Sequence, residues 1–499
     1  MSGEWSVNVK WRMAKDESHA LVFFHYFTIL NSLFTIRCQP GATSHSSKPM
    51  SIEPAACEEP KLIRALGLWG ATAIVMGIMI GSAIFIVPAE ITREVGSPRA
   101  GLAVWLVAGV LSLFGALSFA ELAAMMPQAG GQYVYLREAY GPLVSFLCGW
   151  MMFLVQQSGG IATLAVGLTL YLSNFFPFST FAQRLAAAGV IVVLTAINYR
   201  GVRQGGWVQS VLTGLSVGIV VSLIALGYLL VHGPAAVGSS LPAPTGLRFW
   251  GSFGVAMVAA FWAYEGWSNV TFAGEEVKRP QRNLPLALAL GTGAVMAIYV
   301  GLNLVYYHVL TLPEIAQSSR VAADAAARIM GPRGAQLVAL AIIIAVFGSI
   351  NGSILTAARV YYTMAHDGLF FGWCGTVHPR FRTPHLALLV QGAWSVLLVC
   401  LASYEELFTY SIFAAWIFYA LTALGVIVLR RKRPDLPRPY RVPGYPWVPI
   451  LFVLAASAFV ANTLLEKPTE AGWGTVLVAL GVPVYFIWRA SVKTVGTSQ

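Results

Sequence analysis

The chain has 499 residues, of which 57% are hydrophobic and only 11% are charged, with a net charge of +11. Soluble domains carry about 25% charged residues, and a soluble fold of this length has too little interior to hide so much apolar surface. The composition therefore excludes a soluble protein and predicts an integral membrane protein, because the basic residues lie between apolar segments rather than on one nucleic-acid-binding face.

The first 64 residues do not follow this pattern. Residues 21–36 are apolar but contain His25 and Asn31, and they are shorter than the roughly 20 residues that a membrane-spanning helix needs. We expect residues 1–64 to form a disordered cytoplasmic leader, with Met50 as an alternative start of the protein. A signal-like segment and an extra interfacial helix are the other interpretations of residues 21–36.

Apolar stretches of membrane-spanning length fill residues 65–490. The strands of a membrane β-barrel would be short and alternating, whereas these stretches are long and apolar on all sides. The sequence therefore predicts an all-α membrane domain of twelve transmembrane helices, followed by a cytoplasmic tail at residues 491–499. The helices are expected at residues 66–92, 99–126, 142–172, 183–199, 207–231, 250–273, 284–309, 334–364, 385–402, 407–429, 446–465 and 472–489.

The loops between these helices differ in basic charge. With the amino terminus inside, the inner loops and the carboxyl-terminal tail hold about twice as many Lys and Arg residues as the outer loops. Cytoplasmic loops of membrane proteins carry this excess. The distribution predicts a multi-pass protein of the plasma membrane (the inner membrane in a bacterium) with both termini in the cytoplasm.

Two of the expected helices are interrupted. Gly77 and Gly81 lie inside the first, and Glu265 with the glycine after it lies inside the sixth. Glycine weakens a helix interior by about 1 kcal/mol relative to alanine, although small residues also allow helices to pack closely. Because the two interruptions open two five-helix blocks, 66–231 and 250–429, they indicate a transporter's central binding site.

An unwound helix offers two kinds of free backbone group. The N–H groups at the start of its second half attract a carboxylate, and the C=O groups at the end of its first half accept hydrogen bonds from an ammonium. A zwitterion satisfies both, so a free α-amino acid fits such a site better than a sugar or a purely anionic solute.

A series of motifs, in order along residues 62–489, resembles the amino acid–polyamine–organocation (APC) superfamily of permeases, and most closely its L-type amino acid transporter branch. The motifs are Ile80-Gly81-Ser82-Ala83-Ile84-Phe85, Phe119-Ala120-Glu121-Leu122, Gly130-Gly131-Gln132-Tyr133-Val134-Tyr135, Glu138-Ala139-Tyr140-Gly141, Trp262-Ala263-Tyr264-Glu265-Gly266-Trp267, Glu275-Glu276-Val277-Lys278, Arg282-Asn283-Leu284-Pro285, Gly348-Ser349-Ile350-Asn351-Gly352-Ser353 and Arg441-Val442-Pro443.

This resemblance implies an inverted five-helix repeat with interrupted helices 1 and 6, plus two extra helices. It implies secondary active transport of neutral L-amino acids by alternating access, through antiport or proton-coupled symport. A permease for cationic amino acids or polyamines is the alternative, and a substrate sensor or channel on the same scaffold is the alternative of another class. No P-loop, HExxH, GxSxG or dinucleotide-binding motif suggests an enzyme.

The resemblance also implies where the substrate binds. Its carboxylate meets the unwound part of helix 1, its ammonium meets carbonyl groups of helices 1 and 6, and Trp262 acts as a gate over it. Helix 10, around Phe413 and Trp416, lines the side-chain pocket. The implied substrate-binding residues are Met79, Ile80, Gly81, Ser82, Ala83, Trp262, Ala263, Glu265 and Phe413.

Three features depart from the family pattern. Ala83 replaces the second glycine of the first motif, and Ser216 stands where many relatives carry a lysine on helix 5. Coupling of transport to a proton on that lysine, or to its ammonium in place of Na+, therefore has no support. H+ and Na+ both remain candidate coupling ions. The sequence shows no pattern for a cofactor or a metal ligand. The outer loop at residues 173–182 lacks the cysteine through which the animal members of the family join a heavy subunit, so we expect no disulfide-linked heavy subunit. The expected partners are an amino acid substrate and the lipid bilayer, and no nucleic acid is expected.

Glu265 is the most informative polar residue, since a carboxyl group at the bilayer centre costs about 3 kcal/mol and is functional by default. It could carry a coupling proton, contact the substrate's ammonium or basic side chain, or hydrogen-bond freed N–H groups and only fix the unwound shape. Glu121 and Arg359, near inner helix ends, are expected to pair with opposite charges. Gln156 and Gln157 are candidates to line the cavity.

Overall fold

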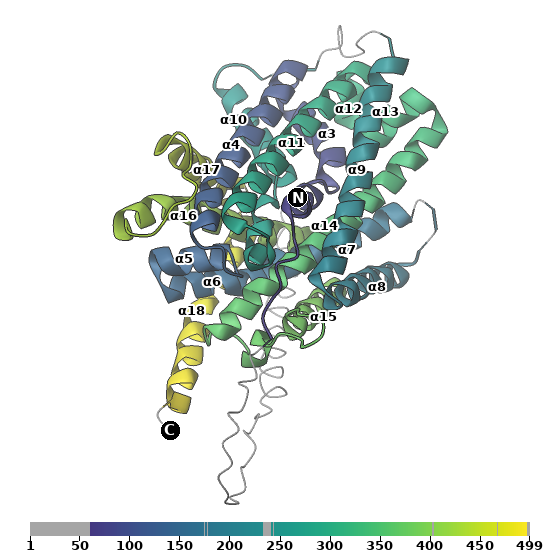
Figure 1. The fold of residues 1–499 in the computed structure, drawn as a ribbon. Helices are drawn as coiled ribbons and strands as arrows, with labels where there is room; N and C mark the ends of the chain where they lie inside the picture. Colours follow the sequence, from purple (N-terminus) through teal and green to yellow (C-terminus); the bar gives the residue numbers. More distant parts are fainter. Residues whose placement is uncertain are drawn as a thin grey trace, which may run out of the picture. The chain divides into compact units, whose positions relative to one another are not determined.

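We describe the chain from a computed structural model (Figure 1). The structure describes residues 60–173, 175–176, 178–232, 241–242, 244–401, 404–466 and 468–496, without the side chains of residues 404–414, 470 and 490–496. The predictions for residues 1–59, including Met50 as a start, lie outside the described residues.

The described chain is helical, and the all-α prediction is confirmed. Within the described residues there is no strand, only one isolated bridge between Leu66 and Val277. The helices are α2 (Leu68–Met79), α3 (Ala83–Val95), α4 (Pro98–Met125), α5 (Gln132–Tyr140), α6 (Pro142–Met151), α7 (Gln157–Leu172), α8 (Thr180–Tyr199), α9 (Val202–Leu230), α10 (Leu247–Ala263), α11 (Pro280–Val309), α12 (Leu312–Gln317), α13 (Val321–Met330), α14 (Pro332–His366), α15 (His385–Leu401), α16 (Tyr404–Lys432), α17 (Trp447–Glu466) and α18 (Pro468–Gly496), with the short elements η1 (Met152–Gln156), η2 (Trp267–Glu276) and η3 (Gly372–Gly375).

Many of these helices are long enough to span a membrane. Of the described helices, 8 are long and apolar enough to cross a membrane, or 9 when α2 and α3, bent by 47° at their break, count as one span. α15 is a shorter apolar helix. A helix or a broken helix lies over each of the predicted ranges, while the number of spans and the inverted repeat stay predictions.

Two of the predicted ranges are less regular than the sequence suggested. Residues 142–172 form α6, a π-helical turn (η1) and α7 rather than one uniform helix. Residues 250–273 contain the end of α10 at Ala263 and the first part of a 3-10 helix, η2. Gly266 between them has φ +108°, a conformation that side chains with a Cβ rarely adopt, so the α-helix cannot continue through it.

The two broken helices touch where they are interrupted. A Cβ added to Gly266 would lie 2.5 Å from the Ile78 side chain, and one added to Gly352 of α14 would also lie 2.5 Å from it. Only glycine leaves room for the isoleucine on both sides. The start of η2, the end of α2 and the middle of α14 therefore meet at Ile78.

Other helices enclose this meeting point. α11 packs along α4 and α2, α10 packs on α3 and α4, and α14 packs against α7, α8 and α9 (Figure 1). Asn351 of α14 donates to Gln209 of α9 at 2.9 Å and accepts from Asn198 of α8 at 2.9 Å. Asn351 therefore bridges helices, which is one of the roles expected of a polar residue in a membrane protein.

A buried ion pair joins α14 to the end of η2. Arg359 donates to both carboxylate oxygens of Glu276, at 2.7 and 3.0 Å, and both side chains are 0% exposed. The carbonyl oxygen of Glu276 also accepts the backbone N–H groups of Ala65 and Leu66, at 2.9 and 3.0 Å. Arg359 therefore pairs with an opposite charge, as predicted, and the pair holds the segment that leads into α2.

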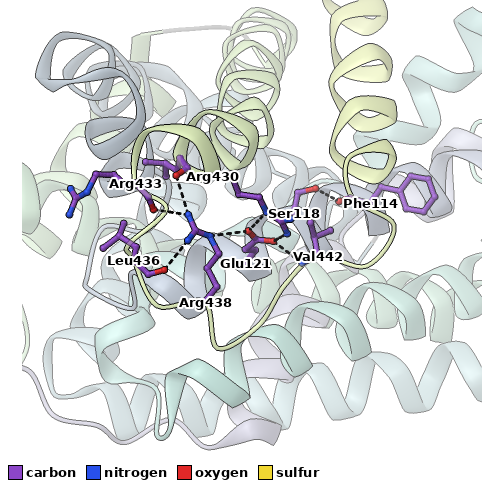
Figure 2. A network of polar contacts seen from close by, with 9 residues as sticks. Phe114, Ser118, Glu121, Arg430, Arg433, Leu436, Arg438 and Val442 are labelled. Atoms are coloured by element: carbon purple, nitrogen blue, oxygen red, sulfur yellow. Dashed lines mark hydrogen bonds and ion pairs between the residues drawn. The ribbon is translucent and has the colours of Figure 1, made fainter.

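A second polar network fixes α4 to α16 and to the segment after it (Figure 2). Glu121, with a side chain 1% exposed, accepts two hydrogen bonds from Arg430, at 2.8 and 2.6 Å, and one from the Val442 amide at 2.7 Å. Arg438 approaches the same carboxylate at 3.8 Å. The prediction that Glu121 is a structural partner for a basic residue is confirmed.

Replacing Glu121 with glutamine is expected to destabilise the protein by about 2 kcal/mol, because two guanidinium groups lose their buried counter-charge. The measurement is the thermal unfolding midpoint of the purified protein in detergent. Glu138→Gln is the matched control: Glu138 lies 3.6 and 3.8 Å from Arg137 and Arg433, is 34% exposed, and should cost less than about 1 kcal/mol. Equal midpoints for the two variants would contradict the role of Glu121.

Candidate functional site

A cavity of about 120 Å³ lies between the two interrupted helices. A larger cavity, of about 220 Å³, lies among α3, α7, α13 and α14, but the free backbone groups of the two interruptions are not gathered around it. The smaller cavity is lined by Ile78, Met79, Gly81, Ser82, Ala83, Gln156, Gln157, Gly160, Thr163, Leu164, Trp262, Ala263, Glu265, Gly266, Asn269 and Ser353.

Most of the residues implied by the family resemblance meet at this cavity. Ile80 is buried beside it, 1% exposed, and is not one of its lining residues. Phe413 is on α16, but its side chain lies outside the described residues. Trp416 packs between Phe261 and Phe459, with ring centres 4.8 and 4.6 Å away, and is not among the described residues that line the cavity. The lining residues from the implied set are Met79, Gly81, Ser82, Ala83, Trp262, Ala263 and Glu265.

One end of the cavity is suited to an anion. α3 begins at Ala83, and the first backbone N–H within it that finds an acceptor is that of Phe85, which donates to the Ser82 carbonyl at 3.1 Å. The N–H groups of Ser82, Ala83 and Ile84 have no acceptor among the described residues. Three free N–H groups at the positive end of a helix form a binding position for a carboxylate. The methyl group of Ala83 lines the cavity without breaking this helical turn.

The carbonyl groups opposite are held by a residue that the sequence did not single out. The hydroxyl of Tyr299, on α11, lies 2.6 Å from the Met79 carbonyl and 3.2 Å from the Ala263 carbonyl. These are the last carbonyls of α2 and α10, where the ammonium was expected. A hydroxyl carries one proton, and each carbonyl has two lone pairs, so Tyr299 fixes their spacing and leaves them able to accept from an ammonium.

Sequence pattern gives only a weak signal for Tyr299. It lies in the middle of an apolar helix, far from either end, where a buried tyrosine hydroxyl must find a partner inside the protein. Tyr306, near the end of the same helix, is also a buried tyrosine, but its hydroxyl has no partner among the described residues. Only the three-dimensional structure distinguishes the two.

Ser349 on α14 holds the end of α2 from the other side. Its hydroxyl lies 2.9 Å from the Gly77 carbonyl, 3.2 Å from that of Ile78, 3.3 Å from that of Ile80 and 3.2 Å from that of its own helix residue Ala345. One hydroxyl proton cannot satisfy all four oxygens. The interruption therefore has surplus acceptors around Ser349 as well as around Tyr299. The sequence placed Ser349 in a motif but assigned it no role.

The wall formed by η1 and α7 is polar. Gln156 and Gln157 both line the cavity, which a regular α-helix does not arrange easily for adjacent residues. The π-helical turn that ends at Gln156 shifts the register, and such turns are frequent at functional sites. Gln157 exchanges two hydrogen bonds with Asn269 of η2, at 3.4 and 3.2 Å. Both glutamines therefore line the cavity, one of the two outcomes that the sequence left open.

Glu265 follows the end of α10 and lines the same cavity. Its backbone N–H donates to the Trp262 carbonyl at 3.1 Å, and its carboxyl group faces the hydroxyl of Tyr419 on α16. That hydroxyl also lies 3.2 Å from the hydroxyl of Ser268. Among the described residues, no freed backbone N–H donates to the Glu265 carboxylate, so the carboxylate does not hold the unwound segment in that way.

Ser216 occupies the helix 5 position where many relatives carry lysine. Its hydroxyl donates to the Leu212 carbonyl of its own helix at 2.9 Å. It is 3% exposed and makes no charged contact with the interruption. In the described part of the chain, no group of three or more His, Cys, Asp or Glu side chains could hold a metal ion.

Comparison with known proteins shows which family the chain belongs to. Residues 66–488 match the family model described as amino acid permease. The serine/threonine exchanger SteT of Bacillus subtilis is 31% identical over 440 residues, covering 86% of this chain and 98% of SteT. The human b(0,+)-type amino acid transporter 1 is 32% identical over 440 residues, covering 86% of this chain and 90% of that protein. The human cystine/glutamate transporter is 30% identical over 446 residues, covering 87% of each chain.

These relatives are transporters and not enzymes, as the sequence predicted. The match runs from the segment before α2 almost to the end of α18, so it includes both interrupted helices and every described residue around the cavity. The chain belongs to the amino acid permease family of the APC superfamily.

Proposed function

We propose that the protein is a secondary active transporter of neutral L-amino acids that works by alternating access. The observation that carries this proposal is the pairing of three free N–H groups at the start of α3 with surplus carbonyl oxygens at the ends of α2 and α10, across one cavity. An α-amino acid carries both a carboxylate and an ammonium, so it can occupy both ends of this cavity at once. Among the described lining residues there is no Lys or Arg that would bind an acidic side chain.

The proposed scaffold is the twelve-helix membrane domain with an inverted five-helix repeat and two extra helices. The positions of the two interruptions, in the first helix of each block, support it. Both termini are assigned to the cytoplasm and the protein to the plasma membrane, on the excess of Lys and Arg in the inner loops. Trp262, which lines the cavity from the end of α10, is the proposed gate over the substrate.

Exchange and ion coupling are the two candidate driving modes. A relative named an exchanger supports antiport. The surplus carbonyl oxygens around Ser349 would also accept a cation, so Na+ is included in the test together with H+. We expect the protein to work without a disulfide-linked heavy subunit, since residues 173–182 contain no cysteine.

The test is counterflow in proteoliposomes loaded with a panel of amino acids, at several pH values, with and without Na+. Saturable counterflow of a neutral α-amino acid is the expected result. Arg, Lys or a polyamine as the sole substrate would favour the cationic alternative, in which Glu265 supplies the counter-charge. Binding without flux would favour a sensor, flux without saturation a channel, and neither binding nor flux would refute the proposal.

We further propose that Glu265 carries the coupling proton. Glu265→Gln is expected to keep substrate binding and to remove most of the pH dependence of uptake, because glutamine has the same shape but cannot exchange a proton. The measurement is initial uptake across pH in both proteins. Glu90→Gln, at an exposed carboxyl group on α3, is the control and should keep the original profile. Unchanged uptake and pH dependence in Glu265→Gln would leave this residue a structural role only.

A further inference from the structure

The wall formed by η1 and α7 carries an inference about which side chain the substrate has. It rests on the proposed function, because it concerns the same cavity. We infer that the site selects amino acids whose short, uncharged side chain ends in a hydroxyl or a carboxamide, and that Gln156 is the residue that recognises this group.

Gln156 is buried at the cavity, and its amide lies near the hydroxyl of Tyr419. It is 5% exposed, and neither its amide nitrogen nor its amide oxygen meets hydrogen-bonding geometry with a partner in the described part of the chain. The Tyr419 hydroxyl accepts from Ser268 at 3.2 Å and interacts with the Gln156 amide only outside that geometry. Buried polar atoms are normally paired. A donor and an acceptor left open together on a cavity wall match a ligand that offers both, as a hydroxyl or a carboxamide does.

A second open group lies about two helical turns further along the same wall. Thr163 of α7 lines the cavity, is 6% exposed, and its hydroxyl oxygen has no partner among the described residues. Gln157 is different, because its amide is already paired on both sides with that of Asn269. The paired amides make a fixed polar surface, while Gln156 and Thr163 provide the unused hydrogen-bonding capacity.

Size and charge narrow the class further. At about 120 Å³ the cavity is well below the roughly 300–1,000 Å³ of pockets for drug-sized ligands, so this arrangement favours a short side chain over a long or aromatic one. Glu265 is the one charged side chain among the described lining residues. When ionised it repels acidic side chains, and no Lys or Arg in the described lining attracts them. Serine, threonine and asparagine are therefore the expected substrates by chemistry.

The test uses pairs of substrates with nearly equal shape. Threonine and valine differ by a hydroxyl in place of a methyl, and asparagine and leucine differ by a carboxamide in place of an isopropyl group. In counterflow with the wild-type protein, we expect kcat/KM for threonine to exceed that for valine at least tenfold, with the same direction for asparagine over leucine. A site built to hydrogen-bond a polar group rejects its apolar analogue because its own groups are then left unpaired.

Gln156→Met keeps the length of the side chain and removes its amide. We expect the threonine-to-valine ratio to fall about tenfold, mainly through a higher KM for threonine, while valine uptake is kept or improved. Gln391→Met is the matched control: Gln391 of α15 is 0% exposed and its amide is also unpartnered in the described chain, but it does not line the cavity. The threonine-to-valine ratio of Gln391→Met should equal that of the wild type.

Thr163→Val and a binding measurement keep the test decisive if Gln156→Met fails to fold. Thr163→Val should lower the same ratio, and threonine should raise the thermal unfolding midpoint of the detergent-solubilised wild type more than valine does. A wild-type ratio near one, a preference for arginine, or an unchanged ratio in folded Gln156→Met would each overturn the inference while amino acid transport stands. Absence of counterflow with every α-amino acid would overturn the proposed function, and this inference with it.

Discussion

Arg359→Met is expected to lower the free energy of unfolding by about 3–5 kcal/mol, because it leaves the Glu276 carboxylate buried without a counter-charge. Both side chains are 0% exposed, and Arg359 also donates to the Leu355 carbonyl of its own helix. No water can reach the carboxylate to replace the lost hydrogen bonds. The measurement is the thermal unfolding midpoint in detergent, followed together with the monodisperse fraction of the protein.

The matched control for this prediction is Arg328→Met. Arg328 contacts Glu314 at 2.5 Å, but the two side chains are 53% and 41% exposed, so the pair contributes less than about 1 kcal/mol. Replacing both buried partners, in Arg359→Met with Glu276→Leu, should recover most of the loss, because apolar side chains of similar volume often substitute for a buried ion pair. An Arg359→Met protein as stable as Arg328→Met would refute the buried charge pair.

Tyr299→Phe is expected to weaken substrate binding roughly 5- to 150-fold, which corresponds to the 1–3 kcal/mol cost of losing a buried hydrogen-bond partner. Without the hydroxyl, the Met79 and Ala263 carbonyls no longer share a donor, and the two helix ends lose their common spacing. The measurement is the KM for counterflow together with the dissociation constant in detergent.

Tyr306→Phe controls for the loss of a tyrosine hydroxyl from α11. Because the Tyr306 hydroxyl has no partner in the described structure, its removal should leave binding and transport unchanged. If Tyr299→Phe and Tyr306→Phe behave alike, the spacing of the two carbonyls does not matter for the substrate.

Local sequence signals predicted two residues that meet at the cavity between the interrupted helices. Gly81 and Glu265 stand out because glycine and a carboxyl group are unfavourable inside a membrane helix, and the structure brings both to one cavity. The form of the second interruption was not predictable in the same way. Gly266 must be glycine because Ile78 of α2 packs against it, and a contact between distant segments leaves no trace in the local pattern.

Pairing between distant charges was predictable in kind but not in detail. The sequence indicates that Arg359 needs a carboxylate, and it offers Glu275 and Glu276 side by side. The structure shows that Glu276 takes this role, while Glu275 accepts the Ala129 amide at 3.4 Å. One residue of difference reverses which carboxylate points inward, because the 3-10 helix sets the direction of each side chain. The 3.6-residue period of an α-helix does not predict which way a side chain points from a 3-10 helix.

The bridge between Leu66 and Val277 has a consequence for how the protein is made. A nascent chain is synthesised from its amino terminus, so α2 is complete long before Glu276 is added. Until then the Ala65 and Leu66 amides lack the acceptor that they have in the folded protein, and Glu276 in turn lacks its counter-charge until Arg359 of α14 has been translated. The segment that leads into α2 is thus secured only after nearly three-quarters of the protein has been synthesised, so the first of the described helices to be made is among the last to be fixed in place.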